Sequence, residues 1–420
     1  MNEKWGQILV LDVATATLRK QAGGMQMDPQ MATKMCERLT PLLNHSNTAV
    51  VMSCVNLLLK VFMHLATPEE KLSVFNKTAA PLITLLTSES STQFLALRSV
   101  RLIIEQVPHM KTLLESEIKV FFIHYNDPVF VKNEKIELLL TITNSENFEQ
   151  VLSELVEYST EADVDFVRKA VGSIGKLAIK LAAAANQCVT KLLEMLTNSK
   201  ISYIVQASII AMRDIFRRYP GHYDTVLGHM TSNLDLESGL DDPEAKAAWC
   251  WILGEYADKI SGADDMLEGY IELFDEESIV VQLTLLTAAV KVFLKVPGQK
   301  PSSMVQDLLV KCTETADNPD LRDRAYIYWR MLSSDPEQAK QVVLGPKPVL
   351  SSEVGLGEDR DIIDELGWRI PNLSSVFLKP SKAFVSREPV YVDASMEGEE
   401  IHNEQLGPAE DGSAELLSLM

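Results

Sequence analysis

Apolar residues recur at three- and four-residue spacing along most of the chain, which is the period of an amphipathic helix, and alternating strand patterns are nearly absent. Cap and turn residues separate the apolar segments. In "ATPEEK", for example, Thr67 can cap a helix that has Pro68 at its first position. The pattern therefore predicts an all-α fold.

Seven of the predicted helices open with a similar phrase, in which polar residues and one long polar side chain precede an apolar run, as in "DVDFVRKAVGSIGKLA". We call the long polar residues the marker residues: Arg98, Lys132, Arg168, Gln206, Lys246, Gln282 and Arg324. By subtraction, they lie 34, 36, 38, 40, 36 and 42 residues apart. A step near forty residues with two helices per step is typical of HEAT or armadillo repeats. Such helix pairs stack into a solenoid with one continuous core.

The chain divides into three predicted regions. Residues 1–341 form the repeats, and their first helix, "EKWGQILVLDVATATL", has no polar capping repeat before it, so we expect that repeats preceded it or that a partner covers this end. Residues 342–385 form a Pro-, Gly- and Ser-rich extended segment over the last repeats, followed by a closing helix near residues 362–378. Residues 386–420 hold nine acidic side chains and one basic one, so we expect a disordered acidic tail.

Composition narrows the classes of function. A net charge of −20 argues against a general nucleic-acid binder and against adhesion of the whole surface to anionic lipid. No window approaches the roughly 18–20 apolar residues of a membrane span. The cysteines are scattered and never form a CxxC pair, so we expect buried, reduced thiols rather than a metal site or disulfides. They are Cys36, Cys54, Cys188, Cys250 and Cys312.

The segment "DNPDLRDRAYIYWR", residues 317–330, is dense in groups that resemble catalytic ones. No histidine, cysteine or serine lies within it to be activated as a nucleophile. Its spacing instead predicts a capped helix with one buried apolar stripe: Leu321, Ala325, Tyr328, Trp329 and Leu332. A second, polar face is formed by Arg322, Tyr326 and Arg330. We interpret the segment as a structural helix, with a partner-binding face as the alternative.

Two other groups of residues resemble binding sites. Gly172 and Gly175 in "VGSIGKLAIK" follow no strand and precede no GKS or GKT, so close helix packing is favoured over a phosphate loop. Arg213, Arg217 and Arg218 form a basic helix end that complements the helix dipole or contacts lipid or an acidic partner. The sequence thus predicts no catalytic residue, no cofactor-binding residue and no metal ligand.

The tail ends in "AELLSLM", where Leu416, Leu417 and Leu419 interrupt an acidic, solvated segment. Apolar residues in such a segment often form a short motif that docks in a groove of a partner. A chance apolar terminus is the alternative.

Several sequence segments resemble those of a known protein family. "EIKVFFIHYNDPVFVKNEK", "WILGEYADKISGADDMLEGY" and "DNPDLRDRAYIYWRMLSSDPEQAKQVVLGPKPVLSSE" are similar to segments of the beta adaptins, the beta subunits of clathrin adaptor complexes of the trans-Golgi and plasma-membrane type. The resemblance is colinear from residue 1 to about residue 385. Roughly the first third of the family's trunk and its folded C-terminal appendage have no counterpart in these segments, so the resemblance leads us to expect a fragment, a shortened gene model or a divergent subunit.

The resemblance implies a non-enzymatic trunk that pairs with a second large adaptin and holds the medium and small subunits. The assembled complex would select transmembrane cargo and bind membranes from the cytoplasm, at trans-Golgi or endosomal membranes or at coated pits. It also implies that Leu416, Leu417 and Leu419 form a box for the clathrin heavy chain, with Met420 in place of the usual acidic residue. No cofactor, nucleic acid or small-molecule substrate is implied. A free-standing HEAT scaffold, such as a transport receptor or phosphatase scaffold, is the alternative.

Overall fold

The computed structural model describes residues 4–21, 27–232, 240–296, 298–314, 316–348, 350, 360–370 and 372–384. Within these residues all regular structure is helical, which confirms the all-α prediction. The chain forms two compact units, Met1–Lys379 and Pro380–Met420. The described part of the second unit is short and contains one 3-10 helix, η5 (Ser381–Ala383).

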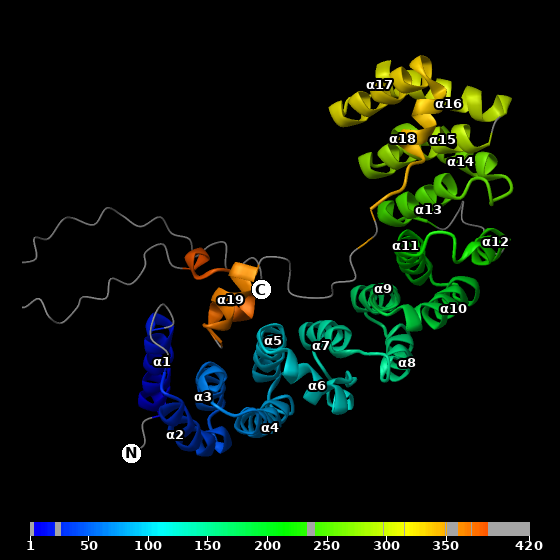
Figure 1. The fold of residues 1–420 in the computed structure, drawn as a ribbon. Helices are drawn as coiled ribbons and strands as arrows, with labels where there is room; N and C mark the ends of the chain where they lie inside the picture. Colours follow the sequence, from blue (N-terminus) through cyan, green and yellow to red (C-terminus); the bar gives the residue numbers. More distant parts are fainter. Residues whose placement is uncertain are drawn as a thin grey trace, which may run out of the picture. The chain divides into compact units, whose positions relative to one another are not determined.

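The first unit is a succession of helix pairs (Figure 1). The odd-numbered helices are α1 (Lys4–Gln21), α3 (Thr48–Val61), α5 (Ser90–Gln106), α7 (Val129–Ile142), α9 (Val164–Lys180), α11 (Ser202–Arg218), α13 (Pro243–Glu255), α15 (Ile279–Lys295) and α17 (Pro319–Ser334). Their even-numbered partners are α2 (Pro29–Leu39), α4 (Pro68–Leu85), α6 (Pro108–Ser116), α8 (Phe148–Tyr158), α10 (Ala182–Asn198), α12 (Asp224–Ser232), α14 (Ala263–Glu272), α16 (Gln299–Glu314) and α18 (Pro336–Val343). Short 3-10 helices join some of them: η1 (Thr40–Asn44), η2 (Phe62–His64), η3 (Ile118–Phe121) and η4 (Phe274–Glu276).

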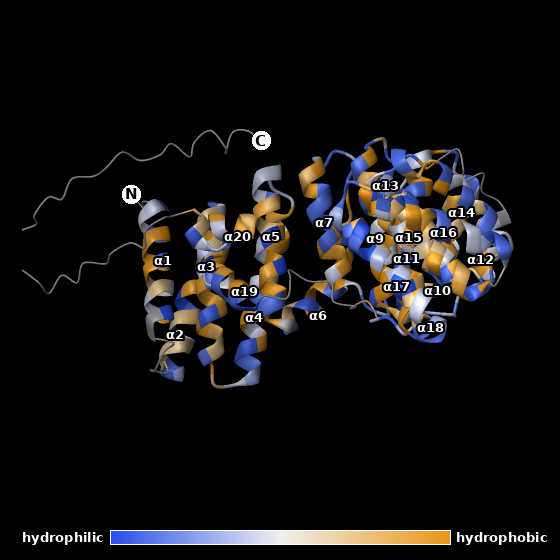
Figure 2. Cartoon of the chain, turned by 90° about the horizontal axis from the view of Figure 1, so that it is seen from above, coloured by the Kyte–Doolittle hydropathy of each residue, from blue (hydrophilic) through white to orange (hydrophobic). Residues whose placement is uncertain are grey.

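Every marker residue lies on an odd-numbered helix, from Arg98 on α5 to Arg324 on α17. From α5 onward, each odd-numbered helix packs against the next odd-numbered one. Figure 2 shows the mixed polar and apolar surfaces of these helices. The repeat predicted from the marker spacing is therefore confirmed, and the solenoid prediction with it.

Local sequence explains where many helices begin. The Thr67 side chain accepts a hydrogen bond from the Glu70 amide, and Pro68 follows at the first helical position, as predicted. Asp163 and Asn318 cap α9 and α17 in the same way. One apolar core runs through the unit from Leu11 to Ile370, and all five cysteines are buried in it.

A ladder of hydrogen bonds joins the C-terminal ends of successive odd-numbered helices. Its donors are Lys180, Tyr219, Tyr256 and Lys295, about 38 residues apart, and each reaches a carbonyl at or just beyond the end of the preceding odd-numbered helix. Lys180 Nζ lies 2.5, 3.0 and 2.8 Å from the carbonyl oxygens of Leu140, Thr141 and Thr143. Because the last carbonyls of a helix have no partner within it, each repeat caps the one before.

The chain turns back after α18. Residues 347 and 350 contact α13 and α11, and the helices α19 (Arg360–Gly367) and α20 (Leu373–Phe377) pack against α5. The extended segment thus lies against earlier repeats than expected. The single closing helix expected over residues 362–378 is two short helices. A proline at 371 supplies no backbone N–H for a continuous helix.

Candidate interaction surface

The predicted C-terminal motif, Leu416, Leu417 and Leu419, lies outside the described residues. The structure therefore leaves this prediction as it stands. The surfaces described next belong to the helical unit Met1–Lys379.

The segment of residues 317–330 forms the start of α17. Asn318 Oδ1 accepts hydrogen bonds from the amides of Asp320 and Leu321 at 2.9 and 3.2 Å. Leu321 and Ala325 are buried as predicted, but Trp329 is 44% exposed, so its place in a buried stripe is wrong. Among the described helices, α17 and α18 form the last stacked pair, so no next repeat covers the outer side of α17. The segment is an ordinary repeat helix with an exposed aromatic face.

The exposed Trp329 borders an apolar cleft of about 450 Å³ between α15, α16, α17 and the start of α18. Its other lining residues include Phe293, Val305, Leu309 and Leu332. Sequence periodicity did not predict this cleft. Periodicity identifies the apolar face of a single helix, whereas the cleft depends on the distance between two helix pairs.

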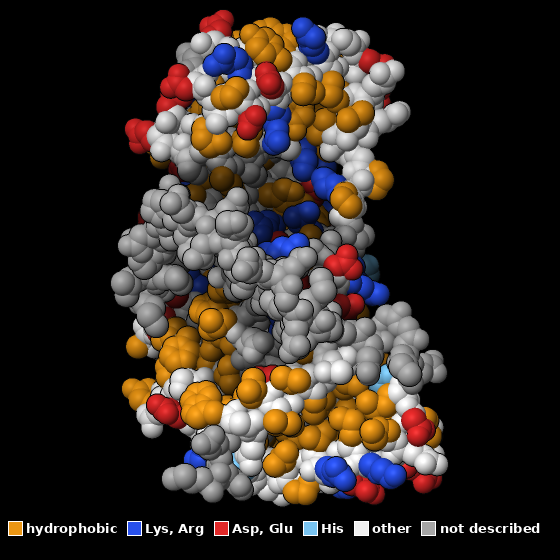
Figure 3. Space-filling view, turned by 90° about the vertical axis from the view of Figure 1, so that its left-hand side faces the viewer, with side chains coloured by type: hydrophobic (Ala, Val, Ile, Leu, Met, Phe, Trp, Pro, Cys, Tyr) orange, Lys and Arg blue, Asp and Glu red, His pale blue; other side chains and the backbone are white. Residues whose placement is uncertain are grey.

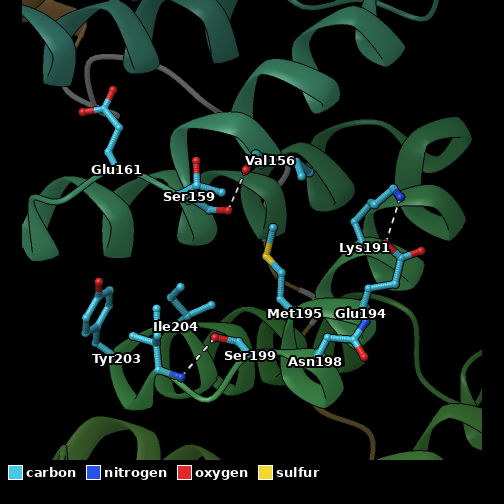
Figure 4. A pocket seen from close by; sticks show the side chains of 12 residues that line it. Val156, Ser159, Glu161, Lys191, Glu194, Met195, Asn198, Ser199, Tyr203 and Ile204 are labelled. Atoms are coloured by element: carbon cyan, nitrogen blue, oxygen red, sulfur yellow. Dashed lines mark hydrogen bonds and ion pairs between the residues drawn. The ribbon is translucent and has the colours of Figure 1, made fainter. Parts of the chain in front are cut away.

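A second cleft, of about 410 Å³, opens at the ends of α8 and α10 and the start of α11 (Figure 4). Val156, Met195 and Ile204 line it with apolar atoms. Its charged side chains are already paired: Lys191 Nζ lies 2.9 Å from Glu194, and Glu161 binds Lys132 at 2.5 Å. Since these charged side chains already form ion pairs, the cleft offers mainly its apolar surface to a binding partner.

Two marker lysines bind a glutamate located just before the next odd-numbered helix. Lys132 Nζ lies 2.5 Å from Glu161, and Lys246 Nζ lies 2.5 Å from Glu277. Arg98, another marker, lies 3.1 Å from the buried Glu134 of the next repeat. These three markers thus tie successive repeats together, and a glutamate about thirty residues downstream of each lysine was the sequence signal for it.

The basic end of α11 is used within the molecule. Arg213 pairs with Asp214 at 3.0 Å and approaches Glu244 at 3.7 Å, while Arg218 donates to the Leu350 carbonyl at 2.8 Å. Arg213 and Arg218 thus have partners within the chain, while the helix-dipole role and the lipid or acidic-partner role both stay predictions. Of the two glycines in α9, Gly175 lies against α11, whereas Gly172 faces open space.

The thiols show no sign of activation. Burial raises the pKa of Cys54, Cys188 and Cys312 to about 12, which keeps these thiols protonated at neutral pH. Within the described residues no group of three or more potential metal ligands is found. In the same part of the chain, no helix has the length and apolarity needed to cross a membrane.

Apolar side chains also gather on one outer face, in the lower part of Figure 3 where α1 lies. Trp5, Leu9, Val10 and Val13 of α1 are 57–82% exposed. Contiguous apolar surface of this kind marks interaction sites. The described residues therefore define a helical-repeat scaffold whose notable features are surfaces and inter-repeat ties.

The comparisons give this scaffold a family. Residues 1–336 match the adaptin N terminal region, and the chain belongs to the adaptin family. It is 47% identical over 384 residues to the AP-1 complex subunit beta-1 of Mus musculus and 43% identical over 385 residues to the AP-1 complex subunit beta of Dictyostelium discoideum. It is 40% identical over 383 residues to the AP-2 complex subunit beta of Schizosaccharomyces pombe. The resemblance to a beta adaptin is confirmed.

These matches cover 91% of this chain but only part of the relatives, namely 39% of the two AP-1 subunits and 54% of the AP-2 subunit. The chain thus spans well under two thirds of the length of these beta subunits. These relatives are named as beta subunits of the AP-1 and AP-2 complexes.

Proposed function

We propose that this chain is a non-enzymatic subunit of a clathrin adaptor complex that acts in vesicle-mediated intracellular protein transport. The helical repeats scaffold the cargo-binding subunits, and the C-terminal Leu416, Leu417 and Leu419 recruit clathrin. The observation that carries the proposal is the match of residues 1–336 to the adaptin N terminal region. The stacking of the marker helices supports it, because a solenoid presents extended surfaces to partners.

The proposed partners are a second large adaptin, a medium and a small adaptor subunit, and the clathrin heavy chain. The chain would act in the cytoplasm, held at trans-Golgi or endosomal membranes or at coated pits by the assembled complex. Its net charge of −20 fits recruitment through partners better than direct adhesion of its whole surface to anionic lipid.

Clathrin recruitment through three leucines would be weak for one copy. Each leucine gains about 1.5–3 kcal/mol on burial. Ordering of the segment and loss of translational freedom offset much of that gain. Many copies assembled on one membrane would then hold a clathrin lattice by avidity.

Affinity purification of the full chain from its own cells, with identification of the bound chains, tests the proposal. We expect a second large adaptin together with medium and small subunits in comparable amounts. A stable monomer that captures none of these chains would contradict the proposal and favour a free-standing HEAT scaffold.

A further inference from the structure

The helices α9 and α11 differ in charge from the rest of the chain. Together they hold seven basic and two acidic side chains, a net charge of +5 within a chain whose net charge is −20. The basic residues are Arg168, Lys169, Lys176, Lys180, Arg213, Arg217 and Arg218. A positive region on so acidic a chain is a candidate surface for a partner that carries negative charge.

Two lysines of α9 share a single carboxylate. Lys169 and Lys176 lie two turns apart, and their Nζ atoms are 3.3 and 3.5 Å from Glu137 Oε1 of α7. The lysine side chains are 30% and 51% exposed. Burial would raise the pKa of the Glu137 carboxyl, but the nearby basic side chains outweigh burial and lower that pKa. One carboxylate therefore serves two lysines, and positive charge remains on the solvent side.

The arginines of α11 continue this positive side. Arg213 and Arg217 are four residues apart, so they share a helix face. Arg213 Nε lies 3.0 Å from Asp214, and its guanidinium lies 3.7 Å from Glu244 of α13, whose side chain is 62% exposed. Arg217 is half-buried and forms no hydrogen bond or ion pair with the residues that the structure describes. Its N–H donors are therefore available to a ligand.

The helix dipole does not explain all of these charges. It acts within the first and last turns of a helix, where it favours a cation at the C-terminal end. Arg217 lies in the last turn of α11, but Arg213 lies before that turn. Lys169 lies near the opposite, N-terminal end of α9, where a cation gains nothing from the dipole.

Close packing of α9 and α11 brings the basic side chains together. Gly175 of α9 faces Ala211 of α11, and Lys176 and Arg213 lie one and two residues beyond this contact. Gly172, between the two lysines of α9, carries no side chain, and a Cβ built there meets open space. In Figure 1, α9 and α11 lie to the left of α10 and α12. Figure 3 looks onto that left-hand side and shows Lys and Arg side chains in its hollowed middle.

We call Lys169, Lys176, Arg213 and Arg217 the basic face, and we propose that it binds an acidic peptide segment of a partner protein. Carboxylates of the segment pair with Arg217 and with the exposed side of Lys176. An extended peptide of about six residues, at about 3.3 Å per residue, spans two helix spacings of about 8–10 Å each. The inference does not depend on the proposed adaptor function, since it uses only the charges and contacts of this chain.

Two observations favour a peptide over an anionic membrane as the ligand. The basic side chains lie in a hollow of the surface, which an extended peptide enters more easily than a flat bilayer does. The net charge of −20 also repels an anionic membrane from the chain as a whole. A short acidic segment interacts mainly with the side chains nearest to it, because salt screens the distant charges.

The decisive variant is Lys176→Gln combined with Arg217→Gln in the full chain. Glu137 keeps Lys169 as its partner in this variant, and Arg217 has no described partner to leave behind. The probe is a fluorescein-labelled octaglutamate peptide, and a Gly-Ser peptide of the same length is its neutral counterpart. Fluorescence anisotropy measures the Kd, and circular dichroism checks that the variant is folded.

Lys34→Gln combined with Arg38→Gln is the matched control. Both residues are exposed on α2, they are four residues apart, and the chain reaches the same net charge as in the decisive variant. Arg38 also lies in the last turn of its helix, as Arg217 does. The control thus separates an effect of the basic face from an effect of net charge.

We expect the decisive variant to raise the Kd for octaglutamate by about fivefold or more, and the control to raise it less than about twofold. The Gly-Ser peptide should bind neither. Equal weakening in the decisive variant and the control would overturn the proposal, as would a failure of octaglutamate to bind the unsubstituted chain. Binding to phosphatidylserine vesicles that requires the basic face, without octaglutamate binding, would assign the face to a membrane instead.

Gly172→Glu tests the same face without removing a basic residue. The new carboxylate stands between Lys169 and Lys176, where there is room for a side chain, and competes with the peptide for both lysines. Gly172→Gln is its neutral control of the same size. We expect octaglutamate to bind Gly172→Glu about threefold or more weakly than Gly172→Gln. Equal affinities of these two variants would contradict a peptide bound at the basic face.

Discussion

Gly175 of α9 and Ala211 of α11 touch across two successive repeats: a Cβ built on Gly175 would lie 2.9 Å from the Ala211 Cβ. That separation is closer than side chains tolerate, so the two helices approach to a distance that only glycine permits at this position. Gly254 of α13 and Ala288 of α15 repeat the arrangement two helices later, at 2.9 Å between the same atoms. A small residue facing a small residue thus sets the spacing of these odd-numbered helices.

The first prediction concerns this contact. Gly175→Ala should lower the free energy of unfolding by about 1–3 kcal/mol, because the added methyl group overpacks the interface. Gly172→Ala is the matched control in the same helix. Its Cβ meets open space, so better helix propensity should raise the stability by about 0.5–1 kcal/mol. Urea midpoints followed by circular dichroism compare the two, and equal midpoints would contradict the contact.

The buried glutamate between α5 and α7 gives the second prediction. Glu134 is 5% exposed in its side chain and binds Arg101 at 2.6 Å and Arg98 at 3.1 Å. Glu134→Gln removes the carboxylate that both guanidinium groups contact directly and leaves only the more distant charge of Glu137, so we expect a loss of about 3–5 kcal/mol. Glu194→Gln removes an exposed pair and should cost less than about 1 kcal/mol. Thermal unfolding of both variants measures the difference, and similar melting temperatures would refute the buried pair.

Lys180 gives a pH-dependent prediction. Burial lowers its pKa from 10.5 to about 8, with a further contribution from nearby Lys111 that Glu115 partly opposes. At a pH between the two pKa values, about 8 in the folded chain and 10.5 in the unfolded chain, Lys180 is protonated in the unfolded chain and neutral in the folded chain. The unfolding free energy therefore gains a term that rises with pH in that window.

Lys180→Met removes this term and leaves three carbonyls without their donor. We expect the unfolding free energy of the variant to be about 1–3 kcal/mol lower than that of the unsubstituted chain at pH 7.5, and this difference to be larger at pH 9.5. Lys176→Met, at a lysine whose side chain is 51% exposed, is the control for the loss of a lysine side chain and should cost less than Lys180→Met at both pH values. Urea titrations at pH 7.5 and pH 9.5 measure the difference in unfolding free energy between the unsubstituted chain and each variant. A difference for Lys180→Met that becomes smaller at pH 9.5 would contradict the lowered pKa of Lys180.

The tail prediction is tested by binding. Leu416→Ala combined with Leu417→Ala should abolish capture of clathrin by the immobilised full chain, since the change removes most of the apolar surface of the motif. Leu406→Ala, at another tail leucine, is the control and should keep binding. Association with the other adaptor subunits should be unaffected in both variants. If the doubly substituted chain still captures clathrin, the proposal that these leucines bind clathrin is wrong.

The sequence determined the helices and the repeat, because both depend on patterns within a few dozen residues. Apolar period, caps such as Thr67 and the marker spacing give the order of the helix pairs before any contact is known. The segments that resemble beta adaptins are also short, local stretches of the sequence, so the family was evident from the sequence. The tail leucines were singled out by the composition of the tail and by the resemblance to the family, and they remain a prediction.

The tertiary structure decided what joins the repeats. The Lys347–Glu255 ion pair joins residues 92 positions apart, and the Arg218–Leu350 hydrogen bond joins residues 132 positions apart. Local sequence periodicity therefore could not predict either contact. The capping ladder through Lys180 and Tyr219, and the exposure of Trp329, likewise depend on which helix lies next in space. Local periodicity fixes which face of a helix is apolar, but only the packing of distant segments decides what that face meets.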